Sequence, residues 1–306
     1  MADELLARAA VRRYTRRCVL LTGGASFLQG CSPLALVNGL TPSSTYIPHA
    51  NLRYGPQARH ALDVYRPAGV LEAAPVVVFF YGGNWHSGNR GDYRFVGEAL
   101  ASKGFVAVLP DYRLYPEVRY PDFLADCALA VRWVLEHITG FDGNSRSLFL
   151  MGHSAGAYNA AMLALNPHYL RAAGTEPGRL RGWIGLAGPY DFLPVTGKIT
   201  QAVFGFPDTA ITTQPIYFAS SEAPPALLAT GENDDVVDPG NSRRLAARLQ
   251  QAGAHARVMV YPGVGHAPLV GALAAPLRGL RGFGPVLDDV AAFIRNVISA
   301  RMGAKS

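Results

Sequence analysis

The segment Ser147–Tyr158, SLFLMGHSAGAY, constrains the fold more than any other part of the 306-residue chain. Its apolar run Leu148–Met151 predicts a buried strand, and the Ala- and Leu-rich residues that follow predict a helix to about Leu165. Between them lies G-x-S-x-G, which is a plain helix-capping turn or a sharp elbow where a Cβ atom beside the serine would not fit. We predict the elbow, with Ser154 as nucleophile and the N–H group of Ala155 facing developing negative charge.

Short apolar segments alternate with helical ones along the rest of the chain. The run Pro75–Phe80, PVVVFF, is typical of a central strand covered on both faces. The alternation predicts an α/β fold with a mostly parallel sheet covered by helices on both faces. The irregular section 189–224, rich in Pro and Phe, predicts a small cap insertion over the site. Strands are expected at 61–65, 75–80, 105–109, 148–151, 182–188, 226–230 and 256–261, and helices at about 92–102, 122–138, 155–165, 241–252 and 285–300.

The N-terminus has the features of a targeting segment. Arg12–Arg17 form a positive region, and the apolar region that follows, from Cys18 to Cys31, is too short to span a membrane. Its end, Leu28–Cys31, resembles the lipobox of bacterial lipoproteins, in which cleavage precedes a cysteine that is then lipid-modified. The resemblance implies a signal peptide at 1–30 and an extracytoplasmic, periplasmic-side protein anchored to a membrane through Cys31. An ordinary secretory signal, an uncleaved anchor and a cytoplasmic protein with a mis-set start remain alternatives.

The chain beyond the targeting segment divides into a linker and a domain. The residues 31–53, with a Ser/Thr run and the prolines Pro33 and Pro42, predict a flexible tether, and an ordered domain is expected over 54–306. With 49% hydrophobic and 16% charged residues, the chain is globular with a large core. Half of the net charge of +6 lies in the first 30 residues, and no basic block comes later, which argues against a nucleic-acid partner. Cys127 is expected to be a small buried residue without a disulfide.

A serine hydroxyl needs a base, and the base needs a carboxylate that orients it. His266 lies in a Gly-rich loop directly after the last expected strand, which makes it the predicted base. Asp234 follows the preceding strand with the spacing G-x-x-D-x-x-V and is the predicted acid, with Asp235 and Asp238 as competitors. Within the elbow, His153 is expected to be structural.

The loop after PVVVFF is the expected source of further oxyanion donors. Its sequence, YGGNW, places two glycines where backbone amides must approach a substrate closely. We predict that the N–H groups of Gly83 and Asn84 act with that of Ala155, and that Gly82 and Trp85 support the loop or the substrate.

The region from about Arg53 to Ile298 resembles the α/β-hydrolases of the esterase/lipase branch. It is similar to the carboxylesterases, kynurenine formamidases and isoprenylcysteine methylesterases that carry H-G-G-x-W, with Tyr81 in place of the histidine. The resemblance implies the α/β-hydrolase fold and a structural role for the Asp-Tyr-Arg stretch. The motifs that carry it are Tyr81–Trp85, Asp111–Arg113, Gly152–Gly156, Gly231–Val237 and Gly265-His266.

Together these features predict a serine hydrolase that cleaves carboxylic esters through an acyl-enzyme intermediate. No cofactor or metal is expected, since the histidines show neither HxxxH nor HxH spacing. The expected partners are a small-molecule ester and a membrane, through the lipid anchor; the oligomeric state and the acyl and alcohol preferences are left open. The alternatives are an amide hydrolase of the arylformamidase kind and a non-catalytic, membrane-tethered binding protein on a hydrolase fold. Five aromatic residues are equally consistent with a pocket wall or with the core of the cap: Phe192, Phe204, Phe206, Tyr217 and Phe218.

Overall fold

The computed structural model describes residues 33–69 and 73–303. The chain divides into two compact units, Met1–Leu36 and Val37–Ser306, and the second holds the sheet and the expected catalytic residues. The expected signal peptide and Cys31 lie outside the described residues. Within the described part of the chain, no helix is both long enough and apolar enough to cross a membrane.

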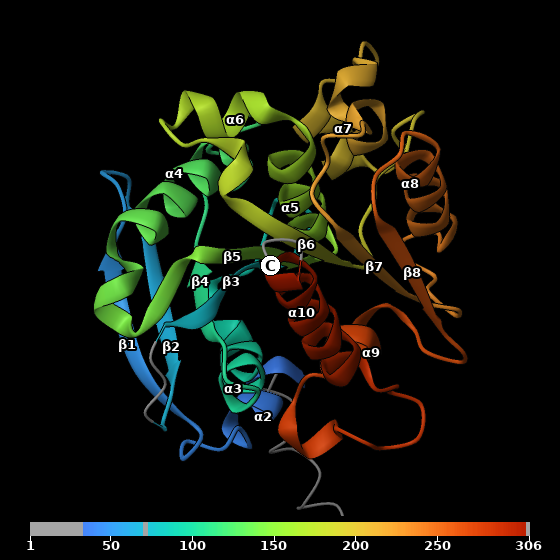
Figure 1. The fold of residues 1–306 in the computed structure, drawn as a ribbon. Coiled ribbons are helices and arrows are strands. Elements are labelled where there is room, and N and C mark those ends of the chain that lie inside the picture. Colours follow the sequence, from blue (N-terminus) through green and yellow to red (C-terminus); the bar gives the residue numbers. More distant parts are fainter. Residues whose placement is uncertain (1–32, 70–72, 304–306) are drawn as a thin grey trace, which may run out of the picture. The chain divides into compact units, whose positions relative to one another are not determined.

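Within the described residues, eight strands form one sheet in the order β1-β2-β4-β3-β5-β6-β7-β8 (Figure 1). β2 is antiparallel to both β1 and β4, and the other neighbours are parallel. The strands β3 and β4 and the segment Leu148–Met151 of β5 are continuous apolar runs, because helices cover both faces of the sheet. The strands are β1 Tyr46–Arg53, β2 Ala61–Pro67, β3 Ala74–Phe80, β4 Val106–Pro110, β5 Gly143–His153, β6 Leu180–Leu186, β7 Ala226–Gly231 and β8 Ala256–Tyr261.

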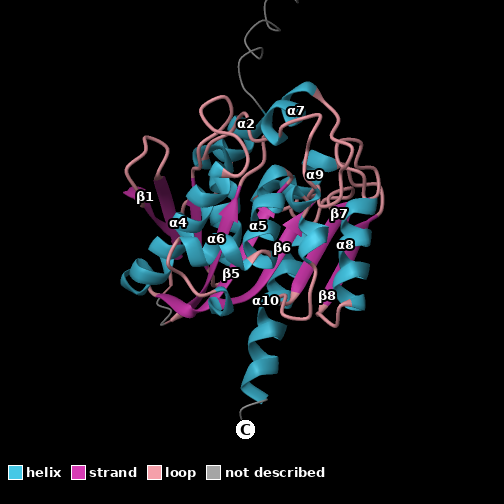
Figure 2. Ribbon diagram, turned by 90° about the horizontal axis from the view of Figure 1, so that it is seen from above, coloured by secondary structure: helices cyan, strands magenta, loops and turns pink. Residues whose placement is uncertain are grey.

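Helices pack on both faces of the sheet. α3 and α10 cover one face, while α4, α5 and α8 cover the other, where Figure 2 shows them in front of the strands. This arrangement is the α/β fold, with a mostly parallel sheet covered by helices on both faces, that the alternation of strands and helices predicts. The helices are α2 Pro33–Gly39, α3 Arg94–Ser102, α4 Asp122–His137, α5 Ala155–Leu165, α6 Pro167–Ala172, α7 Lys198–Phe204, α8 Gly240–Gln251, α9 His266–Gly271 and α10 Val286–Gly303.

The first strand corrects the expected tether. The sequence interpretation assigned 31–53 to a flexible linker, but Pro33–Gly39 form a helix and Tyr46–Arg53 form the edge strand β1. Along β1 only Tyr46 is buried, so the strand lacks the apolar alternation by which strands are recognised. The strand also bulges between His49 and Leu52, which interrupts its period further.

The expected cap section contains α7 and two short 3-10 turns. Hydrogen bonds from α5 and α8 hold this section against the rest of the domain. The hydroxyl of Tyr158 in α5 donates to the carbonyl of Thr213 (2.7 Å), and Asn241 Oδ1 accepts the N–H of Tyr190 (2.8 Å). The segment is therefore a fixed part of the domain's surface rather than a long free loop.

The carboxyl ends of the parallel strands converge at one edge of the sheet. In folds of this kind, ligands bind outside that edge. The loop at Gly82 follows β3, Ser154 follows β5, Asp234 follows β7 and His266 follows β8. Chain topology therefore brings segments together that are up to 184 residues apart in sequence.

Candidate active site

Ser154 sits in a strained turn between β5 and α5. Its backbone has φ 55° and ψ −122°, a conformation that non-glycine residues rarely adopt. The neighbouring glycines are required by close backbone contacts. A Cβ atom on Gly152 would lie 2.1 Å from Gly156 O, and one on Gly156 would lie 2.0 Å from Phe80 O. The elbow is anchored by the Ser154 N–H, which donates to Leu186 O (2.8 Å).

Asp234 and His266 form a hydrogen-bonded pair. His266 Nδ1 lies 2.8 Å from Asp234 Oδ2, and Asp234 is 7% exposed. The other carboxylate oxygen, Oδ1, accepts the backbone N–H groups of Val236 (3.0 Å) and Val237 (2.9 Å). These contacts fix the plane of the carboxylate, so the imidazole that it holds is also fixed.

The contacts of Asp234 determine its ionisation. Burial raises the pKa of the carboxyl, but the hydrogen bonds from His266 and from the two valine N–H groups outweigh it, so the pKa lies below its usual value. Asp234 is therefore ionised at neutral pH and favours the His266 tautomer that carries its proton on Nδ1. That tautomer leaves Nε2 free to accept a proton.

The two competing acids lie elsewhere. Asp235 and Asp238 are both exposed. Asp238 Oδ1 accepts the N–H of Gly240 at the start of α8 (2.8 Å), and Oδ2 pairs with Arg244 (3.2 Å). These contacts hold the pKa of Asp238 below its usual value, chiefly through the Gly240 N–H. Of the three, Asp234 is the one that contacts His266.

The loop after β3 adopts a left-handed backbone. Gly83 has φ 129°, Asn84 has φ 52° and Trp85 has φ 56°. The N–H groups of His86 and Ser87 both turn back to Gly83 O at 3.0 Å. The N–H groups of Gly83 and Asn84 make no hydrogen bond to any part of the chain that the structure describes, so they remain free to donate to a ligand.

Trp85 anchors this loop to the helix that begins at the elbow. Its ring is 2% exposed, and Nε1–H donates to Asn159 Oδ1 in α5 (3.0 Å). The ring also meets Tyr158 and Phe204 edge-on, at centroid distances of 5.1 and 4.8 Å. Sequence reasoning missed Asn159; its signal was a polar side chain within the otherwise apolar run AGAYNAAMLAL.

Two cavities meet at Ser154. One, of about 360 Å³, is lined by Ser154 and His266 together with Gly83, Asn84 and His86. The other, of about 340 Å³, runs under the cap and is lined by Ser154, Ala155 and Trp85, with the cap residues Phe192 and Thr200. Ser154, Asn84 and Val236 border both. A substrate carbonyl at Ser154 thus has room on either side.

The five aromatic residues of the cap section lie in different environments, and not all of them fit a pocket wall or a cap core. Phe192 lines the cavity under the cap, and Phe204 is buried against Trp85. Phe206 and Tyr217 are more than half exposed, at 52% and 53%, and Phe218 packs edge-on against Tyr217. Of these, only Phe192 lines a cavity that holds Ser154.

His153 lies beside His266. Its ring centroid is 4.7 Å from that of His266, and its Nε2 is 3.2 Å from His266 O. Burial, followed by the proximity of His266, lowers the pKa of His153 to about 3. The side chain is therefore neutral at physiological pH and braces the loop that carries the base.

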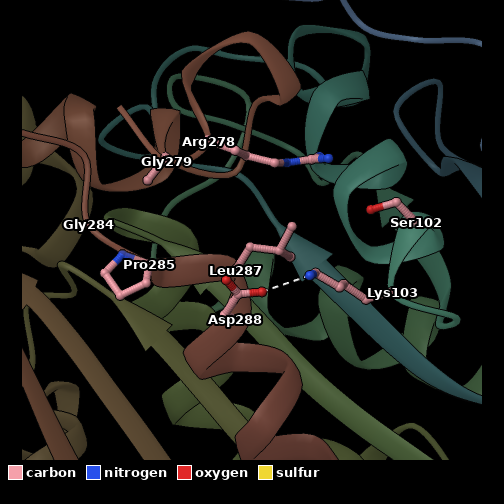
Figure 3. A pocket seen from close by; sticks show the side chains of 9 residues that line it. Ser102, Lys103, Arg278, Gly279, Gly284, Pro285, Leu287 and Asp288 are labelled. Carbon is pink, nitrogen blue, oxygen red and sulfur yellow. Dashed lines mark hydrogen bonds and ion pairs between the residues drawn. The ribbon is translucent and has the colours of Figure 1, made fainter. Parts of the chain in front are cut away.

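A third cavity, of about 220 Å³, lies between α3 and α10, away from these residues (Figure 3). Lys103 and Asp288 face each other across it as an ion pair of 2.7 Å. Ser102 lines this cavity, and its hydroxyl donates to Ala99 O. None of the residues that line the cavity is a histidine. Within 33–69 and 73–303, no three His, Cys, Asp or Glu side chains converge as a metal site requires. Cys127 is buried, as expected from the sequence, and its Sγ accepts the Asn159 side-chain amide at 3.7 Å.

The chain is similar in sequence to several proteins that are named as esterases. It is 28% identical over 262 residues to isoprenylcysteine alpha-carbonyl methylesterase of Arabidopsis thaliana, covering 79% of this chain and 60% of that protein. It is 26% identical to esterase LipC of Mycobacterium tuberculosis, covering 84% of this chain and 67% of that protein. The chain thus spans about 60% of the length of the plant relatives.

Solved structures share the fold. Esterase B of Lactobacillus rhamnosis superposes with a TM-score of 0.75 at 17% identity, over 99% of this chain and 97% of that one. A family model described as BD-FAE matches residues 62–249, more than half of the chain. That range contains the loop at Gly83, the elbow at Ser154 and the loop at Asp234. The chain therefore belongs to the BD-FAE family and has the α/β-hydrolase fold.

Proposed function

We propose that this protein is a carboxylic ester hydrolase that uses Ser154, His266 and Asp234. One observation carries the proposal. His266, which a 2.8 Å hydrogen bond joins to Asp234, lines the same cavity as Ser154 and the unpaired amides of Gly83 and Asn84. Nucleophile, base, orienting acid and oxyanion donors are thus gathered at one edge of the sheet.

Hydrolysis begins with attack of Ser154 Oγ on the ester carbonyl carbon. His266 Nε2 accepts the hydroxyl proton, and Asp234 stabilises the resulting imidazolium. The carbonyl oxygen becomes an oxyanion that accepts the N–H groups of Ala155, Gly83 and Asn84. When the tetrahedral intermediate collapses, the bond to the alcohol breaks and His266 returns the proton to the departing oxygen. Water, deprotonated by the same histidine, then hydrolyses the acyl-enzyme.

The names of the relatives support esters as the substrate class. The Arabidopsis relative is a methylesterase, the mycobacterial relative is an esterase, and a structural neighbour from Thermogutta terrifontis is an esterase with butyrate bound. The cavity under the cap supports an apolar acyl group, because Trp85 and Phe192 line it. Attachment to a membrane through a lipid on Cys31 also remains a proposal.

The test uses p-nitrophenyl esters of increasing acyl length, with Ser154→Ala as the blank. We expect kcat of the variant to fall by a factor on the order of 10³ or more, because removal of the nucleophile leaves only the oxyanion donors and binding. Near-full activity in the variant would refute the assignment. Mass spectrometry of the enzyme after a fluorophosphonate probe provides a second readout, since the adduct should form on Ser154.

Matched ester and formanilide substrates distinguish ester from amide hydrolysis. Both use the same three side chains, but an amide needs a proton delivered to a poorer leaving group. Higher kcat/KM on the formanilide would favour an arylformamidase. Absence of turnover and of probe labelling in the wild type would favour a binding protein on a hydrolase fold.

A further inference from the structure

The loop Tyr81–Gly88 closes on itself directly beside the nucleophile. A Cβ atom on Gly88 would lie 2.9 Å from Gly82 O, so the two ends of the loop touch. A Cβ atom on Gly82 would lie 3.0 Å from both His153 O and Ser154 Cβ, so the loop also touches the elbow. Small displacements of the ends therefore move the amides of Gly83 and Asn84 relative to Ser154 Oγ.

Arg59 joins the two ends of this loop. It lies in the connection between β1 and β2, outside the loop and outside the elbow. Its Nη2 group donates to Tyr81 Oη (2.7 Å) and to Gly88 O (2.7 Å), and its Nε–H donates to Tyr112 O (2.8 Å). The planar guanidinium presents these donors in a fixed geometry, which a flexible ammonium does not reproduce.

Tyr81 is built to receive this contact. Its ring is 1% exposed and stacks on Tyr112 and Tyr93, at centroid distances of 4.7 and 5.9 Å. Its backbone carbonyl accepts the Tyr112 hydroxyl (2.7 Å). Burial raises the pKa of Tyr81 well above its ordinary value, so the side chain stays a neutral phenol whose oxygen accepts from Arg59. The tyrosine that replaces the motif's histidine thus supplies the acceptor.

Two further hydrogen bonds hold the middle of the loop, at Asn84 and Trp85. Trp85 bonds to Asn159, and Thr200 Oγ1 donates to Asn84 Oδ1 (3.1 Å). Left-handed residues such as Asn84 and Trp85 persist only where surrounding contacts determine them. Arg59 supplies such contacts at the two ends of the loop, through its hydrogen bonds to Tyr81 and Gly88.

We propose that Arg59 is a positioning residue for ester hydrolysis, holding Tyr81 and Gly88 so that the Gly83 and Asn84 amides face the oxyanion. The inference rests on the proposed function. It concerns the transition state more than the ground state, because the amides gain their full hydrogen bonds when charge develops on the carbonyl oxygen.

The test compares four variants of the full chain on p-nitrophenyl butyrate. Arg59→Met removes all three donated hydrogen bonds, Arg59→Lys retains the charge, and Tyr81→Phe removes one acceptor while keeping the ring. Arg278→Met is the matched control, because Arg278 is 26% exposed against 28% for Arg59 and pairs with the buried Glu98, and its hydrogen bonds go to Glu98 and Leu273 rather than to the loop. The readouts are kcat, KM, Tm and the Ki of an aryl trifluoromethyl ketone, whose serine adduct carries an oxyanion.

We expect kcat of Arg59→Met to fall about 10- to 100-fold with KM changed less than about threefold, short of the loss caused by deleting a whole donor. The ketone should bind weaker by a similar factor. Arg59→Lys should recover part of the rate, Tyr81→Phe should lose less than Arg59→Met, and Arg278→Met should lower Tm without lowering kcat.

Two outcomes would overturn the inference. One is Arg59→Met with wild-type kcat and ketone affinity. The other is a loss in kcat that Arg278→Met shares at equal loss of Tm, which would make the effect one of general stability. If Arg59→Met does not fold, Arg59→Lys and Tyr81→Phe decide, since unchanged kcat and ketone affinity in both would also overturn it. An inactive wild type that no fluorophosphonate labels would instead refute the proposed function.

Discussion

Replacing Asp234 by Asn tests the orienting acid with the smallest change in shape. Asn has the same volume, and its Oδ1 can keep both hydrogen bonds from the N–H groups of Val236 and Val237, at 3.0 and 2.9 Å. Rotation of the amide is opposed, because it would point an NH₂ group at those two donors. The NH₂ group therefore faces His266 Nδ1, where the carboxylate accepted a hydrogen bond of 2.8 Å.

This change reverses the tautomer of the base. Two N–H donors cannot share that contact, so His266 Nδ1 must become the acceptor and its proton must move to Nε2. A protonated Nε2 cannot take the proton from Ser154 Oγ. By analogy with the serine-protease triad, the loss in kcat should be on the order of 10⁴-fold near neutral pH.

The assay measures kcat on p-nitrophenyl butyrate near pH 7.5, with Asp235→Asn and Asp238→Asn as matched controls. Both control positions are exposed and do not contact His266, so we expect rates within about twofold of wild type. A loss smaller than tenfold in Asp234→Asn, or an equal loss in either control, would refute the assignment of the acid.

The same variant bears on acid stability. Because the pKa of Asp234 is lower in the folded chain than its ordinary value, the ionised form favours folding. That contribution is complete above the unfolded pKa of about 3.9 and is lost as pH falls through the folded pKa. Urea unfolding from pH 6 to pH 3 should therefore show a steeper loss of stability in the wild type than in Asp234→Asn. Identical slopes would contradict the assigned direction.

Three further substitutions test the surrounding structure. Gly83→Ala places a Cβ atom 2.1 Å from Ser87 O at φ 129°, and kcat should fall at least about 100-fold, as steady-state kinetics would show. Asn159→Leu leaves the buried Nε1–H of Trp85 without its acceptor; urea unfolding should show a loss of about 1–3 kcal/mol, and an unchanged midpoint would refute this. Phe192→Ala enlarges the cavity under the cap and should raise kcat/KM for octanoate relative to acetate; an unchanged ratio would place the acyl group elsewhere.

Much of the fold was predictable because its signals are local. The run PVVVFF is apolar at every position, which only a strand covered on both faces requires, and it forms β3. The edge strand β1 was missed for the converse reason: it is paired on one side, mostly exposed and bulged, so its sequence lacks a period. Strand formation there depends on hydrogen-bond pairing with β2, which is a tertiary feature.

The candidate site shows the same division. Ser154 was predictable because the glycines around it mark a backbone that cannot carry side chains. The spacing G-x-x-D-x-x-V favoured Asp234 over Asp235 but did not exclude Asp235, because adjacent residues share nearly the same local signal. Their environments differ through the loop geometry, which buries one carboxylate against His266 and leaves the other in solvent.

By itself, the sequence determined the class of fold, the order of strands β2 to β8 along the chain, and the elbow, since periodicity and steric demand act between neighbours. Only the tertiary structure decided what the loops contact: which aspartate meets His266, that Asn159 receives Trp85, and that Arg59 joins both ends of the loop at Gly83. Such contacts arise because parallel strands bring distant segments to one edge of the sheet. No local sequence pattern indicates which of these distant residues will be in contact.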